Sequence, residues 1–308
     1  MTFDLSLAIA GLVVGFVVGL TGMGGGALMT PILVILFKVQ PLAAVSSDLV
    51  ASFFMKPVGG AVHYRRGTVH RTMVLWLVIG SVPSAFAGVV LLRILGGGHH
   101  VQQIVQTALG AALIVAAAAM VLRAIFQIRQ NAAHGQPADD QPVNVRIVPT
   151  VLVGVVGGLI VGMTSVGSGS LMIVALMLLY PRLTSARLVG TDLVQAIPLV
   201  GSAALGHLFF GDFKLSLTAS LLVGAIPGVY FGARASAQAP SRVIKRAIAF
   251  VLLASGLKLI NVGTVQLGVV LAGLAIAGEP GWMLIKQIVR RLPAPASSRS
   301  AEAAESSS

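Results

Sequence analysis

Runs of about twenty consecutive apolar residues follow one another along most of this chain, and each is long enough to cross a membrane as an α-helix. Apolar residues make up 56% of the 308 residues and charged residues only 10%, against roughly 25% charged residues in soluble proteins. So few polar groups cannot cover a soluble surface. Because helices satisfy their own backbone hydrogen bonds in lipid, the sequence predicts an all-α, polytopic membrane protein.

The apolar runs differ in length, and the short runs predict a different structure from the long ones. The fuller runs are Leu42–Val62, Thr72–Leu92, Val101–Val121, Leu188–Phe210, Leu215–Ala233 and Ala247–Ile260. Two pairs of shorter runs are instead interrupted by the stretches Thr21–Gly26 and Thr164–Gly169. The second run of each pair amounts to about 16 Å of helix, so we expect each pair to form a hairpin that returns to its own side of the membrane. Two short, ordinary spans remain the alternative, because tilt and snorkelling accommodate short spans.

The two halves of the chain are an internal repeat. Ten of the nineteen positions from Gly11 to Met29 are identical to those 143 residues later. After one inserted residue, Asp48 aligns with Asp192 and His63 aligns with His207. Apolar composition alone would not align residues as rare as Asp and His in this chain. The glycines spaced by four, Gly11, Gly15 and Gly19 and their mates Gly154, Gly158 and Gly162, are typical of close helix packing.

Basic residues predict how the repeats are oriented. The loop around Arg65 is basic, whereas its repeat mate, Gly211–Lys214, carries no net charge. If basic loops face the cytoplasm, the two halves have opposite topology, as in inverted-repeat transporters. We therefore expect two inverted repeats, each with one interrupted hairpin and three spanning helices. The N-terminus is expected outside and the C-terminus in the cytoplasm, in a multi-pass protein of the cell inner membrane.

These observations divide the chain into five expected segments. Residues 1–128 form the first repeat, 129–146 a cytoplasmic linker, 147–262 the second repeat, 263–292 a C-terminal apolar segment and 293–308 a disordered tail.

The two glycine-rich turns are the main candidate for a binding site. Irregular backbone at membrane depth occurs where protein or a water-filled cavity satisfies its polar groups. Each turn also opens a short helix, whose free N–H groups and positive dipole end attract anions. We expect two such helix ends, facing each other, to bind a small anion. The residues expected to bind it are Thr21, Gly22, Gly24, Gly25, Gly26, Lys56, Thr164, Ser165, Gly167, Ser168 and Gly169.

Among these residues, Lys56 lies well inside its apolar run and has no charged repeat mate, so it is the candidate counter-charge. Asp48 and Asp192 are candidates for bracing the turns or for carrying a coupling cation. A direct contact between either carboxylate and an anion would be repulsive. His63 and His207 are expected to be structural or to relay protons.

Several classes of function are excluded by what the sequence lacks. The chain has no cysteine, no nucleophile paired with a base, no nucleotide-binding motif and no metal cluster, so we expect no enzyme activity, no cofactor and no metal. The net charge of +12 is spread over short loops with no basic stripe, which argues against nucleic-acid binding. The expected partners are a small anion and the lipid bilayer. Coupling to a proton or cation and assembly as a homodimer stay open.

Each repeat opens with a glycine-rich segment, Gly15–Gly26 or Gly158–Gly169, which is followed by an Asp-containing helix, and a hydrophilic linker joins the repeats. This pattern of the two repeats resembles the sulfite exporter TauE/SafE family. The resemblance covers roughly residues 5–262. It implies a bacterial inner-membrane permease that exports sulfite, sulfoacetate, other sulfonates or related anions. The alternatives are a passive anion channel of the same fold and a permease for a non-sulfur organic anion. The second turn departs from the first by carrying serines where Gly22 and Gly25 stand.

Overall fold

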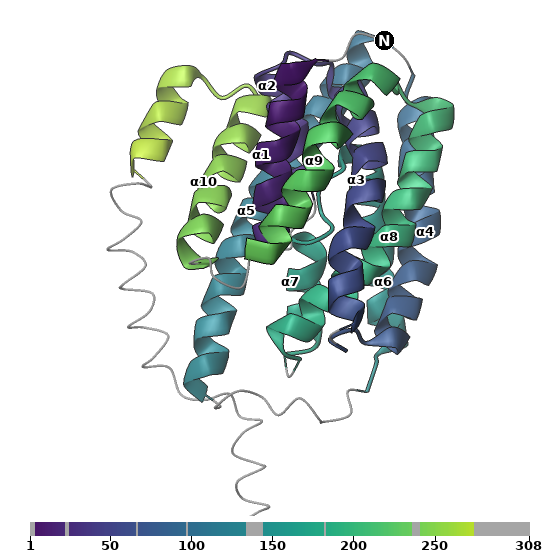
Figure 1. Ribbon diagram of the computed structural model, residues 1–308, viewed down its shortest axis with the longest axis vertical. Coiled ribbons are helices and arrows are strands. Elements are labelled where there is room, and N and C mark those ends of the chain that lie inside the picture. Colours follow the sequence, from purple (N-terminus) through teal and green to yellow (C-terminus); the bar gives the residue numbers. More distant parts are fainter. Residues whose placement is uncertain are drawn as a thin grey trace, which may run out of the picture.

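The computed structural model describes residues 4–21, 25–65, 67–96, 98–133, 144–181, 183–235 and 241–273. Over these ranges the chain is a bundle of helices without a β-strand, apart from one isolated bridge between Gly167 and Gly169 (Figure 1). The all-α prediction is therefore confirmed.

The first half contributes five helices and the second half five more among the described residues. They are α1 (Leu5–Thr21), α2 (Gly26–Ile35), α3 (Pro41–Arg65), α4 (Arg71–Ile94), α5 (His99–Ala133), α6 (Ile147–Thr164), α7 (Leu171–Leu179), α8 (Ser185–Phe210), α9 (Leu215–Ala235) and α10 (Ser241–Leu259). A shorter apolar helix, Thr264–Gly273, follows α10.

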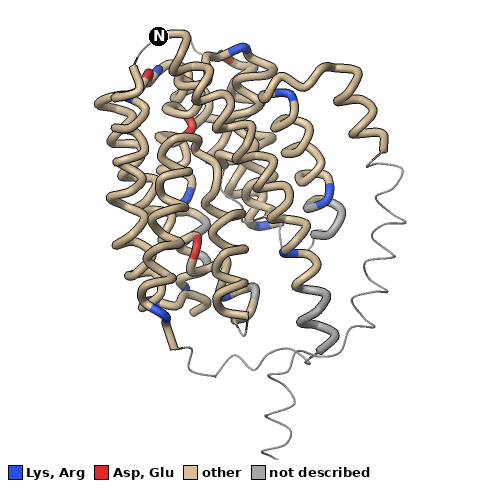
Figure 2. The backbone as a smooth tube through the Cα atoms, turned by 180° about the vertical axis from the view of Figure 1, so that it is seen from behind, with Lys and Arg blue, Asp and Glu red and all other residues tan. Residues whose placement is uncertain are grey.

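Five of these helices are long and apolar enough to cross a membrane, namely α4, α5, α6, α8 and α9. Large apolar side chains such as Leu152 and Phe231 are 57% exposed, which suits contact with lipid. Helix α3 is also long, but it carries Asp48 and Lys56 and is less apolar. Charged positions are sparse in the middle of the bundle and gather toward its ends (Figure 2). The prediction of a polytopic membrane protein is confirmed.

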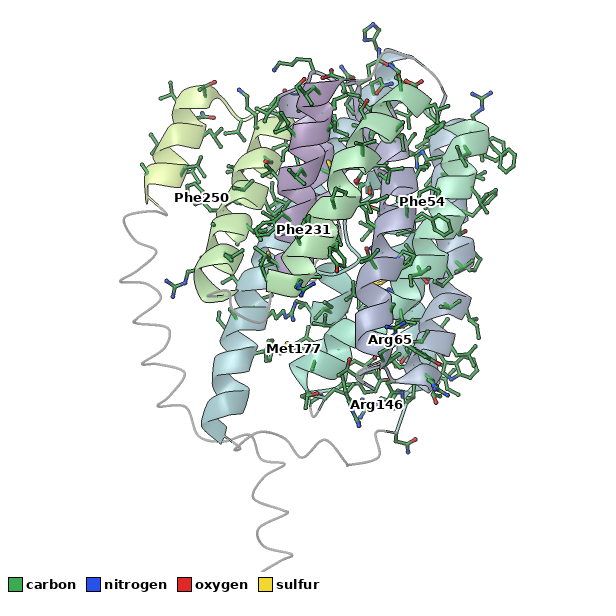
Figure 3. All side chains as sticks on the ribbon, viewed as in Figure 1. Phe54, Arg65, Arg146, Met177, Phe231 and Phe250 are labelled. Carbon is green, nitrogen blue, oxygen red and sulfur yellow. The ribbon has the colours of Figure 1, made fainter. Side chains whose placement is uncertain are left out.

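The helices pair across the two halves of the chain. Helix α1 packs against α9, α4 against α6, α3 against α8 and α5 against α10. In Figure 1 the first hairpin, α1 and α2, lies at the upper end of the bundle and α7 lies toward the lower end. Arg65 and Arg146 lie together at the lower end (Figure 3), as the charge pattern requires. This arrangement suits an inverted repeat, but the inverted relation and the side facing the cytoplasm stay predictions.

The glycines spaced by four pack as the sequence predicts. A Cβ on Gly11, Gly15 or Gly19 would collide with the backbone of α9, at Leu221, Ala225 and Val229. The repeat-mate glycines of α6 make equivalent contacts. A Cβ on Gly154, Gly158 or Gly162 would collide with the backbone of α4. Small residues at both interfaces therefore let the helix backbones approach closely and fix each hairpin against a spanning helix of the other half.

Some predicted boundaries and residues differ from the structure or lie outside its description. Helix α5 continues to Ala133, so residues 129–133 of the expected linker are helical. Gly22, Gly24 and most of the linker lie outside the described residues, as does the side chain of His63. The C-terminal apolar segment is described only to Gly273. The expected disordered tail, 293–308, lies outside the described residues altogether.

Substitution of Gly158 tests the close packing of α6 on α4. A methyl group there would meet the Ser81 carbonyl and the Ser84 hydroxyl, so we expect Gly158→Ala to lower the free energy of unfolding by about 1–3 kcal/mol. Thermal unfolding of the purified protein in detergent measures the loss. Gly268→Ala is the control, because its added Cβ would meet no described residue outside the adjacent helix backbone within 4 Å. Equal melting temperatures for the two variants would contradict this packing.

Candidate functional site

The two glycine-rich turns meet in the interior of the bundle. Gly26, at the start of α2, lies so close to Ser165 that a Cβ on Gly26 would overlap the Ser165 carbonyl and hydroxyl oxygens. Ser165 ends α6 in the left-handed conformation, and Gly167 and Gly169 follow with φ angles of +135° and +96°. Glycine is favoured at the last two positions because other residues are strained there. The turns of both halves thus form one region, as the sequence predicts.

Asp48 of α3 ties the second turn to the first half. Its side chain is fully buried, and its Oδ2 accepts hydrogen bonds from Thr30 Oγ1 at 2.8 Å and from Ser165 Oγ at 2.6 Å. Thr30 belongs to α2 and Ser165 to the second turn. The carboxylate therefore joins three segments, a geometry that suits the predicted bracing role.

Lys56 lies two helical turns further along α3 and also contacts the second turn. Its ammonium group is buried and donates a hydrogen bond of 2.6 Å to Ser168 Oγ. It is close enough to both Asp48 and Asp192 to attract each carboxylate electrostatically. Because Ser168 accepts this hydrogen bond, its own hydroxyl hydrogen remains available to a second acceptor. The pair thus offers a positive charge and a hydroxyl donor at one point.

Asp192 of α8 has a different environment from its repeat mate. Its Oδ1 accepts a 3.0 Å hydrogen bond from Gln195 Nε2, whose Oε1 in turn accepts one of 3.3 Å from Ser81. Besides Lys56, the guanidinium of Arg123 on α5 attracts Asp192 electrostatically. Arg123 lies on α5, which continues past it to Ala133. Asp192 therefore has two positively charged side chains that attract it.

His207 joins three helices through both ring nitrogens. Its Nδ1 lies 2.8 Å from Ser46 Oγ of α3, and its Nε2 lies 2.8 Å from the carbonyl oxygen of Gly162 in α6. A carbonyl oxygen only accepts, so Nε2 carries the hydrogen of that bond. The imidazole is completely buried. This geometry favours the structural reading of His207 over proton relay.

Several buried polar atoms near the turns lack a hydrogen-bond partner. Among the described residues they are Ser47 Oγ, Asp48 Oδ1, Ser52 Oγ, Ser170 Oγ and Asp192 Oδ2. Most buried polar groups in proteins are paired, so unpaired buried oxygens near the turns point to a ligand or a proton. Each Asp contributes one such oxygen, and Ser170 directly precedes α7.

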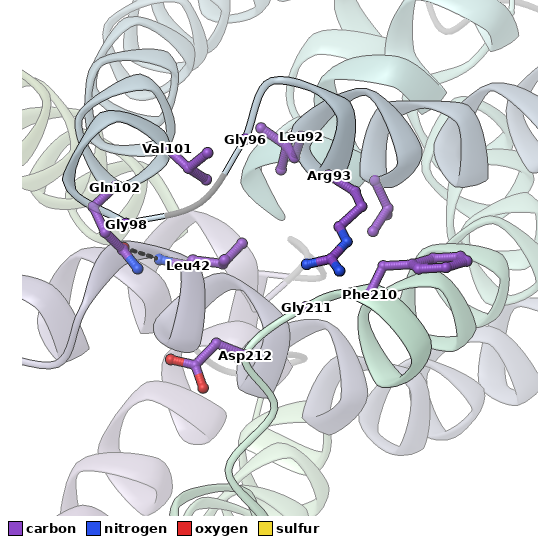
Figure 4. Close-up of a pocket in the computed structure, with 11 residues that line it drawn as sticks. Leu42, Leu92, Arg93, Gly96, Gly98, Val101, Gln102, Phe210, Gly211 and Asp212 are labelled. Carbon is purple, nitrogen blue, oxygen red and sulfur yellow. Dashed lines mark hydrogen bonds between the residues drawn. The ribbon is translucent and has the colours of Figure 1, made fainter.

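A separate pocket of about 210 Å³ lies where α4 ends and α5 begins (Figure 4). Arg93 and Asp212 line it together with Leu42, the Gly96–Gly98 turn and the end of α8. Neither charged side chain belongs to the predicted site. Leu42 lies four residues before Ser46, and the Ser46 hydroxyl contacts the Leu42 carbonyl. The pocket therefore adjoins the His207 contact but is distinct from the turns.

The structure thus brings together most of the predicted site residues that it describes. Gly25, Gly26, Lys56, Asp48, Ser165 and Ser168 converge, and Gly167 and Gly169 shape the second turn. The hydroxyls of Thr21 and Thr164 instead bond to backbone carbonyls of their own helices. Thr30, Ser52, Gln195 and Arg123 were missed. Of these, the polar side chains of Thr30, Ser52 and Gln195 inside apolar runs could have been noticed.

Removal of the imidazole tests the structural role of His207. We expect His207→Ala to lower the free energy of unfolding by about 2–4 kcal/mol, because it leaves the Gly162 carbonyl unpaired and opens a cavity. Thermal unfolding in detergent measures the effect, with the exposed His100→Ala as control. A His207→Ala protein as stable as the control would show that these contacts do not hold the helices together.

Comparisons with known proteins agree with this geometry. A family model described as sulfite exporter TauE/SafE matches residues 7–259. In Bacillus subtilis (strain 168), the probable membrane transporter protein YjnA is 39% identical over 260 residues, which cover 83% of this chain and 100% of the relative. The probable membrane transporter protein YdhB of the same organism is 25% identical over 250 residues, covering 80% and 96% of the two chains. No solved structure matches. The chain therefore belongs to the sulfite exporter TauE/SafE family of membrane transporters.

Proposed function

We propose that this protein is a secondary transporter of small sulfur-containing anions, such as sulfite, sulfoacetate and other sulfonates, and that it exports them across the inner membrane. The observation that supports this most directly is the buried Lys56 ammonium on the Ser168 hydroxyl, between two glycine-rich turns. A buried ionisable group inside a spanning bundle is costly and is usually kept for function. The family name, sulfite exporter, supports the substrate class and the outward direction.

The anion head group is proposed to bind between Lys56 and the second turn. The ammonium group supplies charge, the Ser168 hydroxyl supplies a donor, and the unpaired hydroxyl of Ser170 stands at the start of α7. The first two N–H groups of α7 bond to the Gly167 carbonyl, so α7 would favour an anion through the positive end of its helix dipole. A sulfonate or sulfite presents several acceptor oxygens around one sulfur, so several of these donors can bind it at once. The site lies between the halves of the chain, where transporters with repeats bind their cargo.

Alternating access is proposed to follow from the pairing of the halves. The first hairpin packs on α9 and the second on α4, so each hairpin moves with a helix of the other half. If the first hairpin with α9 rocked against the second hairpin with α4, the turns would open first to one side of the membrane and then to the other. The site residues Asp48, Lys56, Ser165 and Ser168 are all buried in the structure, which fits a closed intermediate of such a cycle.

A passive anion channel of the same fold is the second candidate, and counterflow separates the two. In proteoliposomes loaded with unlabelled sulfite, a carrier accumulates labelled sulfite transiently by exchange, whereas a channel conducts current without exchange. Because the described site is closed and contains a fixed charge that binds one anion, we expect counterflow. A carrier function is consistent with the transporter descriptions of the relatives.

Substitution of Lys56 tests the proposed anion site. We expect Lys56→Met to weaken binding of labelled sulfite about tenfold to hundredfold, since a hydrogen bond to a charged group contributes about 1.5–3 kcal/mol. Lys258→Met is the matched control, because Lys258 is exposed on α10 and bonds only to Thr264 among the described residues. Equal sulfite affinity in both variants would refute the assignment of Lys56. Preference for carboxylates over sulfur anions in the unaltered protein would refute the substrate class.

A further inference from the structure

We propose that Asp48 is a proton-binding site that takes up one proton for each anion bound at Lys56 and the second turn. This inference rests on the proposed function and adds to it the coupling ion and its residue. A proton from water, on the side of the membrane to which the site is open, forms an O–H bond with Asp48 Oδ1. The same proton is released to water on the other side. Proton and anion therefore cross together.

The charge balance of the interior supports such coupling. Asp48 and Lys56 are buried on α3 and both bond to the second turn, so one carboxylate and one ammonium group face the proposed anion site. These two charges cancel. A monovalent anion added alone would leave one uncompensated negative charge in a medium of low dielectric constant, which is strongly unfavourable. A proton added at the same time keeps the region neutral.

The hydrogen-bond partners identify Asp48, and not Asp192, as the proton acceptor. Asp48 is bonded to the hydroxyls of Thr30 and Ser165, and a hydroxyl can either donate or accept. A protonated Asp48 can therefore keep its contacts after one partner reverses its role. The amide nitrogen of Gln195, which contacts Asp192, can only donate and so favours an ionised acceptor. Two bases attract Asp192, whereas Lys56 alone attracts Asp48.

An unpaired oxygen marks the place for the proton. Among the described residues, Asp48 Oδ1 and Ser52 Oγ are both buried without a hydrogen-bond partner. They lie on the same side of Gly25, where an added Cβ would be 3.9 Å from Oδ1 and 3.3 Å from Oγ. Both oxygens therefore lie beside a glycine that presents no side chain to them. A proton on Oδ1 could be donated to Ser52 Oγ after a small side-chain rotation, which would pair both atoms.

The helices that pack on α3 offer few other titratable groups to this position. Helix α2 has none, and the tip of the second turn contributes only hydroxyls. On α9, Tyr230 is exposed and Arg234 lies at the C-terminal end. The groups on α5 and α8 that face the region are Arg123, Asp192 and His207. Both ring nitrogens of His207 are engaged by Ser46 and the Gly162 carbonyl.

Proteoliposomes with a trapped pH-sensitive dye test this assignment. The probe is radiolabelled methanesulfonate, which stays ionised over the working pH range, so every proton that moves belongs to the protein. Membrane potential is set with potassium and valinomycin. For the unaltered protein we expect one proton per anion and a flux that does not respond to membrane potential. Uptake without proton movement, or proton movement only when sodium is present, would overturn the proposal.

Asp48→Asn and its repeat mate Asp192→Asn form a matched pair. Asparagine resembles the protonated acid, so Asp48→Asn should still exchange labelled for unlabelled methanesulfonate. Its net flux should move no protons and should become dependent on membrane potential. Asp192→Asn should keep one proton per anion. Proton coupling that is retained in Asp48→Asn would overturn the assignment, and so would proton coupling that is lost in Asp192→Asn. The measurement on Asp192→Asn is decisive even if the Asp48→Asn protein does not fold.

The same experiment separates this inference from the proposed function. If trifluoroacetate, a sulfur-free anion that also stays ionised, moves with one proton and methanesulfonate does not move, the sulfur-anion substrate is wrong and the role of Asp48 stands. If methanesulfonate moves without protons, the substrate class stands and the role of Asp48 is wrong. A carrier that moves one proton with each anion is electroneutral. It exports the anion whenever the outward concentration gradient of the anion exceeds the inward concentration gradient of protons.

Discussion

The hydrogen bond from Ser165 to the Asp48 carboxylate is the contact on which the rest of the site depends. A chain that breaks two helices inside a membrane must satisfy the exposed polar groups with protein, because lipid offers no partners. Here a buried acid from one half holds the turn of the other half, and Thr30 holds the same oxygen from α2. The close contact of Gly26 with Ser165 follows from this arrangement. Lys56, on the same helix as Asp48, is thereby aimed at Ser168.

The two halves keep a common architecture but differ at the centre. Asp48 is surrounded by hydroxyl groups, whereas Asp192 has the Gln195 amide as its partner. Lys56 is matched by Val200 in the second half, so the repeat supplies one ammonium group and not two. A symmetric site would place equal charges on both sides. In the proposed transport cycle, this asymmetry would let one half contact the anion while the Asp of that half changes its protonation.

Much of the fold could be predicted from the sequence, because apolar periodicity and the internal repeat are strong signals. The glycines spaced by four predicted helix contacts that the structure confirms, and the two glycine-rich turns were expected to meet. The partners of the acids could not be predicted. The repeat aligned Asp48 with Asp192 but said nothing of Thr30 or Gln195, since cross-helix contacts depend on rotation and depth. The interaction of Arg123 with Asp192 could not be predicted for the same reason, because Arg123 lies beyond the apolar run Val101–Val121, on a part of α5 whose neighbours the sequence does not show.

The central claim is that Asp48 and Ser165 couple the two halves through one buried hydrogen bond. A double-mutant cycle with Asp48→Ala and Ser165→Ala, each of which removes the hydrogen bond, measures that coupling as the part of the unfolding free energy that is not additive. For a hydrogen bond to a charged group we expect a coupling energy of about 1.5–3 kcal/mol. Strictly additive effects, with no coupling energy beyond experimental error, would contradict the account.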